Sequence, residues 1–454
     1  MKIMTKRILT VALAITMVFA MAACGQDSEQ TQGTPTPIET PDVSTDVKTV
    51  ELTADLTAEE PDPEKVDEYF DAMWESQDSG SKVRIASFEL FKKLAGEDVS
   101  KAENTLISPL SFMVAMGMLE NGTQGDSLEE IEKAFGIDIG DFNDWYDAWY
   151  KLIKTTSGDA LNIANSVWYR NDGSGLEVED DFLDKMALLY RAKAYSAAFD
   201  EGTVADMNNW VKDNTDGMIN KIVDKLRKDD QMMLINATCF EGQWFQDYEG
   251  DQITENETFT REDGSEDKVV MLHSLESENT YYSTDLFTGT KKAYKNGFHI
   301  VFLLPNEGKT VAEVIDSLSG EDFSSLGESS MVADVELTIP EFSFDYEAKD
   351  AISALNEMGI NTVFDDEKAD LSPMAHMETG ENLYVSKIIH KTHIELDREG
   401  TKAAAVTGIG IANATALLMD VPKVELRLDR PFIFAICDSN TNIPVFLGTV
   451  QGIN

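Results

Sequence analysis

Apolar and polar positions divide this chain into an early part rich in helices and a later part rich in strands. Helical spacing of apolar residues recurs over 83–94, 111–120, 180–192 and 207–226. Short apolar runs predict strands at 160–169, 232–239, 268–272, 299–304, 335–340, 393–396, 424–428, 432–437 and 445–450, with a helix at 348–358. Because helices and strands do not alternate regularly, the pattern predicts an α+β protein.

Residues 399–411 carry a different pattern. The alternate positions are small or apolar, namely Thr401, Ala403, Ala405, Thr407, Ile409 and Ile411. Alternate side chains of a strand point to opposite faces, so one face of this segment suits burial. Gly, Ala and Thr are nevertheless weak strand formers, and a small-residue run taken alone favours a flexible loop. Both interpretations remain open at this point.

The N-terminus has the pattern of an export signal. Lys2, Lys6 and Arg7 precede an apolar run over 8–22 that ends in small residues. Cys24 follows directly, which resembles the lipobox of bacterial lipoproteins. That resemblance implies a signal peptide over 1–23, acylation of Cys24, and a protein anchored by lipid to the bacterial cell surface. The alternative is an ordinary signal peptide cut nearby.

Composition sets the remaining boundaries. Residues 24–63 are rich in Thr, Pro and acidic residues and predict an extended tether. A short helical lead-in is expected over 64–81, and the globular pattern continues over 82–454.

The chain is strongly acidic. Its formal net charge is −46, and loss of the three cations within 1–23 would make it −49. Such a chain repels nucleic acid and anionic lipid, so neither is an expected partner surface. Cys239 and Cys437 both sit in apolar runs, where buried free thiols are favoured over a disulfide. The spacing of Cys and His predicts no metal site, and no cofactor is expected.

Eight short motifs, in order, resemble the serpin family across residues 82–454. They are the segments at 104–111 (NTLISPLS), 118–125 (MLENGTQG), 208–219 (NNWVKDNTDGMI), 236–244 (NATCFEGQW), 388–391 (IIHK), 399–401 (EGT), 429–432 (DRPF) and 444–450 (PVFLGTV). Each motif is weak alone, whereas their shared order is specific.

The resemblance implies the serpin fold, with three β-sheets, eight or nine helices and an exposed reactive-centre loop. It also implies a monomeric suicide inhibitor of serine proteases. The protease cleaves the loop and forms an acyl-enzyme, and the freed loop then inserts into the main sheet as a strand. No nucleophile elbow or triad pattern occurs among the motifs, so enzyme activity is not expected.

Site residues are carried over position by position. The loop hinge is expected at Glu399, Gly400, Thr401, Ala403, Ala404 and Ala405; a cluster that controls opening of the sheet, the shutter, at Ser108, Ser111, Asn236 and His390; and a tryptophan near the point of insertion, in the breach, at Trp244. Arg398 departs from the family pattern, in which Glu is usual at this position. A single histidine on an apolar strand, such as His390, is usually a hydrogen-bonded core residue, and that is also the role expected here.

The reactive bond depends on how the loop is counted. Counting from the hinge places it between Ala414 and Thr415, which favours an elastase-like or subtilisin-like target. Counting back from Pro431 places it near Asp420 instead. Cleavage at Leu417, Leu418 or Met419 would favour a chymotrypsin-like or papain-like protease.

Two other functions remain open. The first is a serpin that no longer inhibits and acts as a surface binding or scaffold protein. Such members tend to carry bulky or charged hinge residues, whereas Thr401, Ala403 and Ala405, on the face that suits burial, are small and uncharged. The second is a lipoprotein that binds small solutes, which would require the eight motif matches to be accidental.

Overall fold

The computed structural model describes residues 48–171, 173, 175–228, 230–401 and 421–453. The chain separates into two units, residues 1–44 and 45–454, and the described residues all belong to the second. The expected signal peptide, Cys24 and most of the tether therefore lie outside the described residues, as do the loop positions from 402 to 420.

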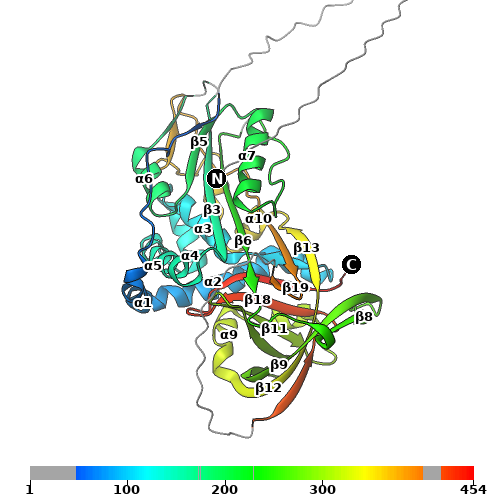
Figure 1. Cartoon of the computed structure of the whole chain (residues 1–454). Coiled ribbons are helices and arrows are strands. Elements are labelled where there is room, and N and C mark those ends of the chain that lie inside the picture. Colours follow the sequence, from blue (N-terminus) through cyan, green and yellow to red (C-terminus); the bar gives the residue numbers. More distant parts are fainter. Residues whose placement is uncertain (1–47, 172, 174, 229, 402–420, 454) are drawn as a thin grey trace, which may run out of the picture. The chain divides into compact units, whose positions relative to one another are not determined.

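Two four-stranded sheets contain several of the predicted site residues, among them Asn236 on β6 and Thr401 on β16. The first has the strand order β1-β5-β3-β6 and the second the order β13-β15-β16-β7. Their strands are β1 (Val50–Glu51), β3 (Leu161–Arg170), β5 (Lys193–Ala197), β6 (Met232–Phe240), β7 (Gly242–Gln243), β13 (Phe342–Glu347), β15 (Lys391–Leu396) and β16 (Gly400–Thr401). Figure 1 shows β5, β3 and β6 side by side, with α7 (Glu201–Asn214) beside them.

A nine-stranded sheet forms the other large layer. Its order is β17-β12-β9-β10-β11-β18-β19-β2, and β8 pairs with β9. The strands are β2 (Thr105–Ile107), β8 (Ile253–Thr260), β9 (Glu266–Ser283), β10 (Phe287–Ala293), β11 (Phe298–Pro305), β12 (Ser330–Pro340), β17 (Lys423–Arg427), β18 (Phe432–Asp438) and β19 (Pro444–Val450). A two-stranded sheet pairs β4 (Leu176–Val178) with β14 (Ala375–Met377).

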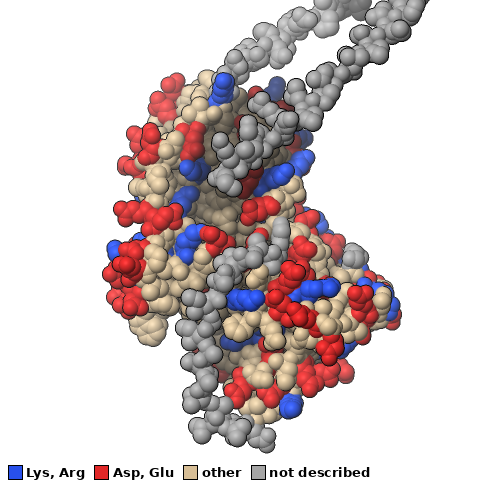
Figure 2. Space-filling view, in the orientation of Figure 1, with Lys and Arg blue, Asp and Glu red and all other residues tan. Residues whose placement is uncertain are grey.

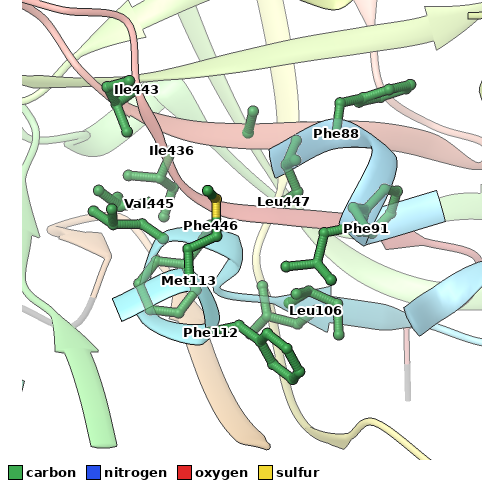
Figure 3. Packing of buried hydrophobic residues seen from close by; sticks show 14 of the residues in the cluster. Phe88, Phe91, Leu106, Phe112, Met113, Ile436, Ile443, Val445, Phe446 and Leu447 are labelled. Carbon is green, nitrogen blue, oxygen red and sulfur yellow. The ribbon is translucent and has the colours of Figure 1, made fainter. Parts of the chain in front are cut away.

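The described part contains ten α-helices. Besides α7 they are α1 (Val66–Glu75), α2 (Gln77–Ser100), α3 (Pro109–Glu120), α4 (Asp126–Phe135), α5 (Ile139–Ser157), α6 (Asp180–Leu188), α8 (Val311–Ser317), α9 (Gly320–Ser324) and α10 (Ala351–Glu357). In the core shown in Figure 3, Phe88 and Phe91 of α2 and Phe112 and Met113 of α3 pack against Phe446 and its neighbours. Burial of this apolar surface is the main stabilising contribution to the fold.

Helices and strands together confirm the predicted α+β class. The predicted strands at 232–239, 299–304 and 445–450 correspond to β6, β11 and β19 within one residue at either end. Cys239 and Cys437 are buried and form no disulfide, as predicted. Figure 2 shows acidic side chains spread over the visible face, with Lys and Arg between them.

The helix predicted over 207–226 ends twelve residues early, at Asn214. The next residues favour a turn, since Asp216 and Gly217 both have positive φ. Asn208 then binds the chain that follows: its Oδ1 accepts from the backbone N–H groups of Ile222 and Val223 at 2.8 and 3.0 Å. These side-chain bonds satisfy backbone groups that a continued helix would have used.

The chain joins the first sheet earlier than its composition indicated. Within the expected tether, β1 pairs with Tyr195 and Ser196 of β5, and Thr53 is fully buried. The Thr53 hydroxyl accepts a hydrogen bond from the Ala194 backbone N–H at 3.1 Å. Polar composition therefore did not prevent this stretch from pairing with a sheet edge, because the pairing uses backbone groups. The expected start of the domain at residue 82 falls inside α2.

Within the described residues, no helix is both long and apolar enough to cross a bilayer. The same residues contain no cluster of His, Cys, Asp or Glu suited to a metal ion.

Candidate functional site

Two strand edges face each other without hydrogen bonds between them. β6 is the last strand of its sheet, and β15 of the second sheet lies next to it. Between them are two small cavities of about 10 and 40 Å³. The larger one borders α3 and is lined by Leu234 and Asn236 of β6, by Val385 and by residues 387–390. Unpaired strand edges are ready to accept another strand.

The base of the predicted loop lies at one end of this gap. Residues 397–401, here called the loop base, make a tight turn in which Asp397 Oδ1 accepts from the N–H groups of Glu399 and Gly400 at 2.7 and 3.1 Å. Strand β16 then pairs with β15 on one side and with β7 on the other. The chain is thus a strand at Gly400–Thr401, held between β15 and β7 at one end of the gap.

Gly400 is required by a close backbone contact. A Cβ atom there would lie 2.0 Å from the carbonyl oxygen of Gly242, and the φ angle is +152°. No side chain fits this approach, so any substitution would push β16 away from β7. The sequence motif at 399–401 therefore has a direct steric cause.

Arg398 has a local partner that the sequence did not reveal. Its guanidinium binds Glu341 through Nε–Oε1 at 2.9 Å and Nη2–Oε2 at 3.2 Å, and its backbone N–H donates to Oε1 at 3.1 Å. The carboxylate raises the pKa of Arg398. This fork geometry ties the loop base to the end of β12 and gives a role to the residue that departs from the family pattern.

Trp244 is buried beside the loop base. Its indole N–H donates to the carbonyl oxygen of Asp397 at 2.8 Å, and its ring stacks on Tyr294 with centroids 4.6 Å apart. The hydroxyl of Tyr294 shares a hydrogen bond of 2.6 Å with Thr401 Oγ1. Burial raises the pKa of Tyr294, so this hydroxyl stays neutral. Trp244 and Thr401, both predicted from sequence, are thus joined through Tyr294.

The structure brings Ser108, Ser111, Asn236 and His390 together beneath the gap. The Ser108 backbone N–H donates to His390 Nε2 at 3.0 Å, and Ser108 Oγ donates to the carbonyl oxygen of Val445 at 2.7 Å. Ser111 Oγ donates to Asn236 Oδ1. These four residues, called the shutter cluster, link α3 to both sides of the gap.

Burial determines the charge of His390. Desolvation lowers its pKa from 6.5 to about 4, so the ring is neutral at pH 7. Nε2 accepts the Ser108 N–H, which places the ring proton on Nδ1. Protonation of Nε2 would remove this acceptor and leave a charge between β15 and α3.

Some site residues lie outside the described residues, and others escaped the sequence analysis. Ala403, Ala404, Ala405, Ala414, Thr415 and the alternative cleavage positions 417–420 belong to the first group. Glu341, Tyr294 and Asn165 belong to the second. Asn165 Oδ1 accepts from Asn236 Nδ2 at 2.7 Å; its signal was a polar residue inside the apolar run 160–169. Glu341 and Tyr294 gave no signal.

The loop base therefore lies beside two neighbouring strand edges that are not paired with each other. Comparison with known proteins identifies the family to which such a site belongs. The family profile described as "Serpin (serine protease inhibitor)" matches residues 81–452. The chain therefore belongs to the serpin family, whose members are mostly protease inhibitors rather than catalytic enzymes.

Individual relatives are similar over most of the chain. Alpha-1-antiproteinase of Callosciurus caniceps is 30% identical over 80% of this chain and 86% of its own. An uncharacterized serpin-like protein of Thermococcus kodakarensis is 27% identical, over 84% and 88%. The solved structure of the thermophilic serpin tengpin in its native state is 35% identical, with a TM-score of 0.75 over 90% of this chain and all of that one.

Proposed function

We propose that this chain is a suicide-substrate inhibitor of extracellular serine proteases. The protease cleaves the reactive-centre loop, and the freed loop inserts between β6 and β15 while the acyl-enzyme is still intact. Acylated Cys24 and the residues up to 47 tether the inhibitor to the cell surface. The cleaved bond is Ala414–Thr415, which suits an elastase-like or subtilisin-like protease.

One observation carries this proposal. The facing edges of β6 and β15 share no hydrogen bonds, and β16 already enters the gap at Thr401. An inserted strand would pair with backbone groups on both sides, each net hydrogen bond contributing about 0.5–1.5 kcal/mol. The small residues at Ala403 and Ala405 would fill the space without overpacking.

The test is incubation of the purified protein with elastase, subtilisin, chymotrypsin and papain, followed by denaturing gels. We expect a gel-stable complex with elastase or subtilisin, and release of a C-terminal peptide whose mass shows that it begins at Thr415. A peptide that begins after Leu417, Leu418 or Met419 would move the bond and shift the target toward chymotrypsin or papain. A peptide that begins after Asp420 would support the count back from Pro431. Clean cleavage without complex for every protease would refute the proposal.

A matched pair of variants tests the insertion step. Ala403→Arg puts a charge on the face expected to be buried, and Ala404→Arg puts the same charge on the opposite face. We expect Ala403→Arg to turn the inhibitor into a substrate that is cleaved without complex, because a buried unpaired cation is strongly unfavourable. Ala404→Arg should retain complex formation. Equal behaviour of the two variants would contradict insertion as a strand.

A second candidate function is a serpin that binds a ligand without inhibiting. The observation that favours it is a cavity of about 410 Å³ between α2 and the nine-stranded sheet, with Arg84, Lys291 and buried His299 in its lining. Its size and basic groups suit a small anion with an apolar body. Absence of complex with every protease, together with saturable binding of such an anion that Arg84→Gln abolishes, would establish this function instead.

A further inference from the structure

Lys292 is a buried lysine close to the loop base. It lies near the end of β10 and is only 6% exposed. Lysine is rarely buried without a specific partner, because desolvation of the ammonium group is costly. Lys292 lies outside the eight sequence motifs and belongs neither to the shutter cluster nor to the loop hinge.

The ammonium group forms an ion pair with a carboxylate, which is in turn part of a short series of hydrogen bonds. Lys292 Nζ is 2.5 Å from Glu276 Oε1 on β9. The hydroxyl of Ser274 also donates to Glu276 Oε1, at 2.6 Å, and shares a hydrogen bond of 3.2 Å with the hydroxyl of Tyr248. A β-bulge directly follows Glu276 in the pairing of β9 with β12. Bulges redirect side chains in this way next to functional sites.

Two aromatic rings enclose the other side of the ammonium group. Lys292 Nζ lies 5.4 Å from the ring centroid of Trp244 and 5.0 Å from that of Tyr248. The two rings are perpendicular, with centroids 6.4 Å apart. Each distance is within the range of a cation–π interaction, which strengthens when the cation is desolvated. Lys292 therefore holds both rings of the segment 244–248, here called the clamp segment.

The backbone of the clamp segment binds the loop base. The N–H of Trp244 donates to the carbonyl oxygen of Glu399 at 3.0 Å, and the N–H of Tyr248 donates to that of Arg398 at 3.1 Å. The Trp244 indole adds the bond to Asp397. The two residues that contact Lys292 through their rings are thus the two that hold the loop base through their N–H groups.

We propose that Lys292 is a positioning residue for loop insertion. Its ammonium group, fixed by Glu276, holds Trp244 and Tyr248 and through them sets where the loop base stands at the mouth of the gap. The proposal rests on the proposed function, because positioning matters only where a loop inserts. A hydrophobic residue would fill the same space at a lower desolvation cost. The presence of lysine here therefore points to a role for its positive charge.

Removal of the charge should release the loop base and ease opening of the gap. The test measures uptake of a synthetic peptide with the sequence of residues 401–414 by the full chain, followed on native gels, without any protease. We expect Lys292→Met to raise the uptake rate about tenfold, since the cation–π contacts with Trp244 and Tyr248 are lost. Lys292→Arg should restore the wild-type rate, because a guanidinium also stacks on aromatic rings.

Two further variants separate positioning from simple loss of structure. Lys292→Met/Glu276→Gln removes both charges, so no buried carboxylate is left unpaired, and it should fold and show the same faster uptake. Lys295→Met is the matched control: Lys295 pairs with Asp247 of the clamp segment at 3.3 Å but at the rim, and its loss should leave the rate unchanged. Lys292→Met should shift the tryptophan emission of the protein. The same substitution should cause no shift in a protein that also carries Trp244→Phe, because Trp244 is the ring that contacts Lys292.

Uptake by Lys292→Met within twofold of wild type, or uptake by Lys292→Arg equal to that of Lys292→Met, would refute the proposal. If the protein inhibits no protease yet these variants change peptide uptake as expected, the proposed function fails and the role of Lys292 stands.

Discussion

The nine-stranded sheet and the pair of four-stranded sheets treat their strands differently. In the nine-stranded sheet β11, β18 and β19 have a partner on both sides, and every residue of these three strands is buried. In the pair, β6 and β15 face each other without hydrogen bonds. The first region is called the completed sheet here because these three strands have no free edge, whereas in the second region two neighbouring strand edges stay unpaired.

This difference indicates where the fold keeps unused binding free energy. Strands β11, β18 and β19 have no free edge for another strand, whereas the unpaired edges of β6 and β15 could each gain a ladder of hydrogen bonds. The groups that hold the gap in its open-edged form are few, namely the shutter cluster beneath it and the contacts of the loop base at its mouth. Substitutions in the two regions should therefore differ in kind as well as in size.

The largest effect is expected from the completed sheet. Phe302 is fully buried in β11 and packs edge-on against Phe432. Phe302→Ala should lower the free energy of unfolding by about 3–5 kcal/mol through lost contacts and a cavity. Denaturant unfolding should show the same loss before and after cleavage of the loop. A loss confined to the uncleaved form would mean that the two regions are not separate.

Acid should weaken both regions, but open only one. His299 and His390 have pKa values lowered from 6.5 to about 4 by burial. Between pH 6.5 and about 4 these histidines bind protons in the unfolded state but not in the folded state. Their contribution to the free energy of unfolding is therefore full above pH 6.5, decreases as the pH falls toward 4, and does not change further below pH 4. Each histidine contributes up to about 3 kcal/mol.

Two matched variants divide this pH dependence. His299→Gln and His390→Gln should each remove about half of the acid-induced loss measured by denaturant unfolding. Uptake of the 401–414 peptide should rise in acid for wild type and for His299→Gln, because His390 can still protonate and release Ser108. Acid-accelerated uptake that persists in His390→Gln would exclude the shutter cluster as its cause.

A pair of hydroxyl deletions compares the two regions at one hydrogen bond each. Ser111→Ala removes the bond to Asn236 in the shutter cluster, and Thr105→Val removes the buried 2.9 Å bond to Thr449 in the completed sheet. Both should cost about 1–2 kcal/mol of unfolding free energy. Only Ser111→Ala should speed peptide uptake. Faster uptake in Thr105→Val would show that general destabilisation is sufficient.

The smallest effect is expected at the rim of the gap. Arg398 and Glu341 are 43% and 20% exposed in their side chains, so solvent weakens their attraction. Arg398→Glu should cost about 0.5–1 kcal/mol in thermal unfolding and reduce the rate of complex formation. The exchange Arg398→Glu/Glu341→Arg should recover both, because the fork geometry is restored in reverse. Failure of the exchange would show that the arginine acts on another group.

The residues of the site that lie within family motifs could be predicted from the sequence. The hinge at Gly400 and Thr401 could be predicted because it belongs to the family motif at 399–401, and the alternation of small residues that follows suits a buried strand face. The shutter cluster came from short motifs. Pairings between distant segments left no such mark: Glu341 with Arg398, Lys292 with Glu276, and β1 with β5 follow from sheet register. The early end of α7 depends on the side chain of Asn208, which periodicity does not register.

The central claim is that the loop becomes a strand between β6 and β15. Hydrogen exchange of the β6 and β15 backbone amides, measured before and after cleavage within 402–420, tests it most directly. Protection should rise along both strands after cleavage, while β11 and β18 of the completed sheet should stay unchanged. Equal exchange of β6 and β15 before and after cleavage would contradict it.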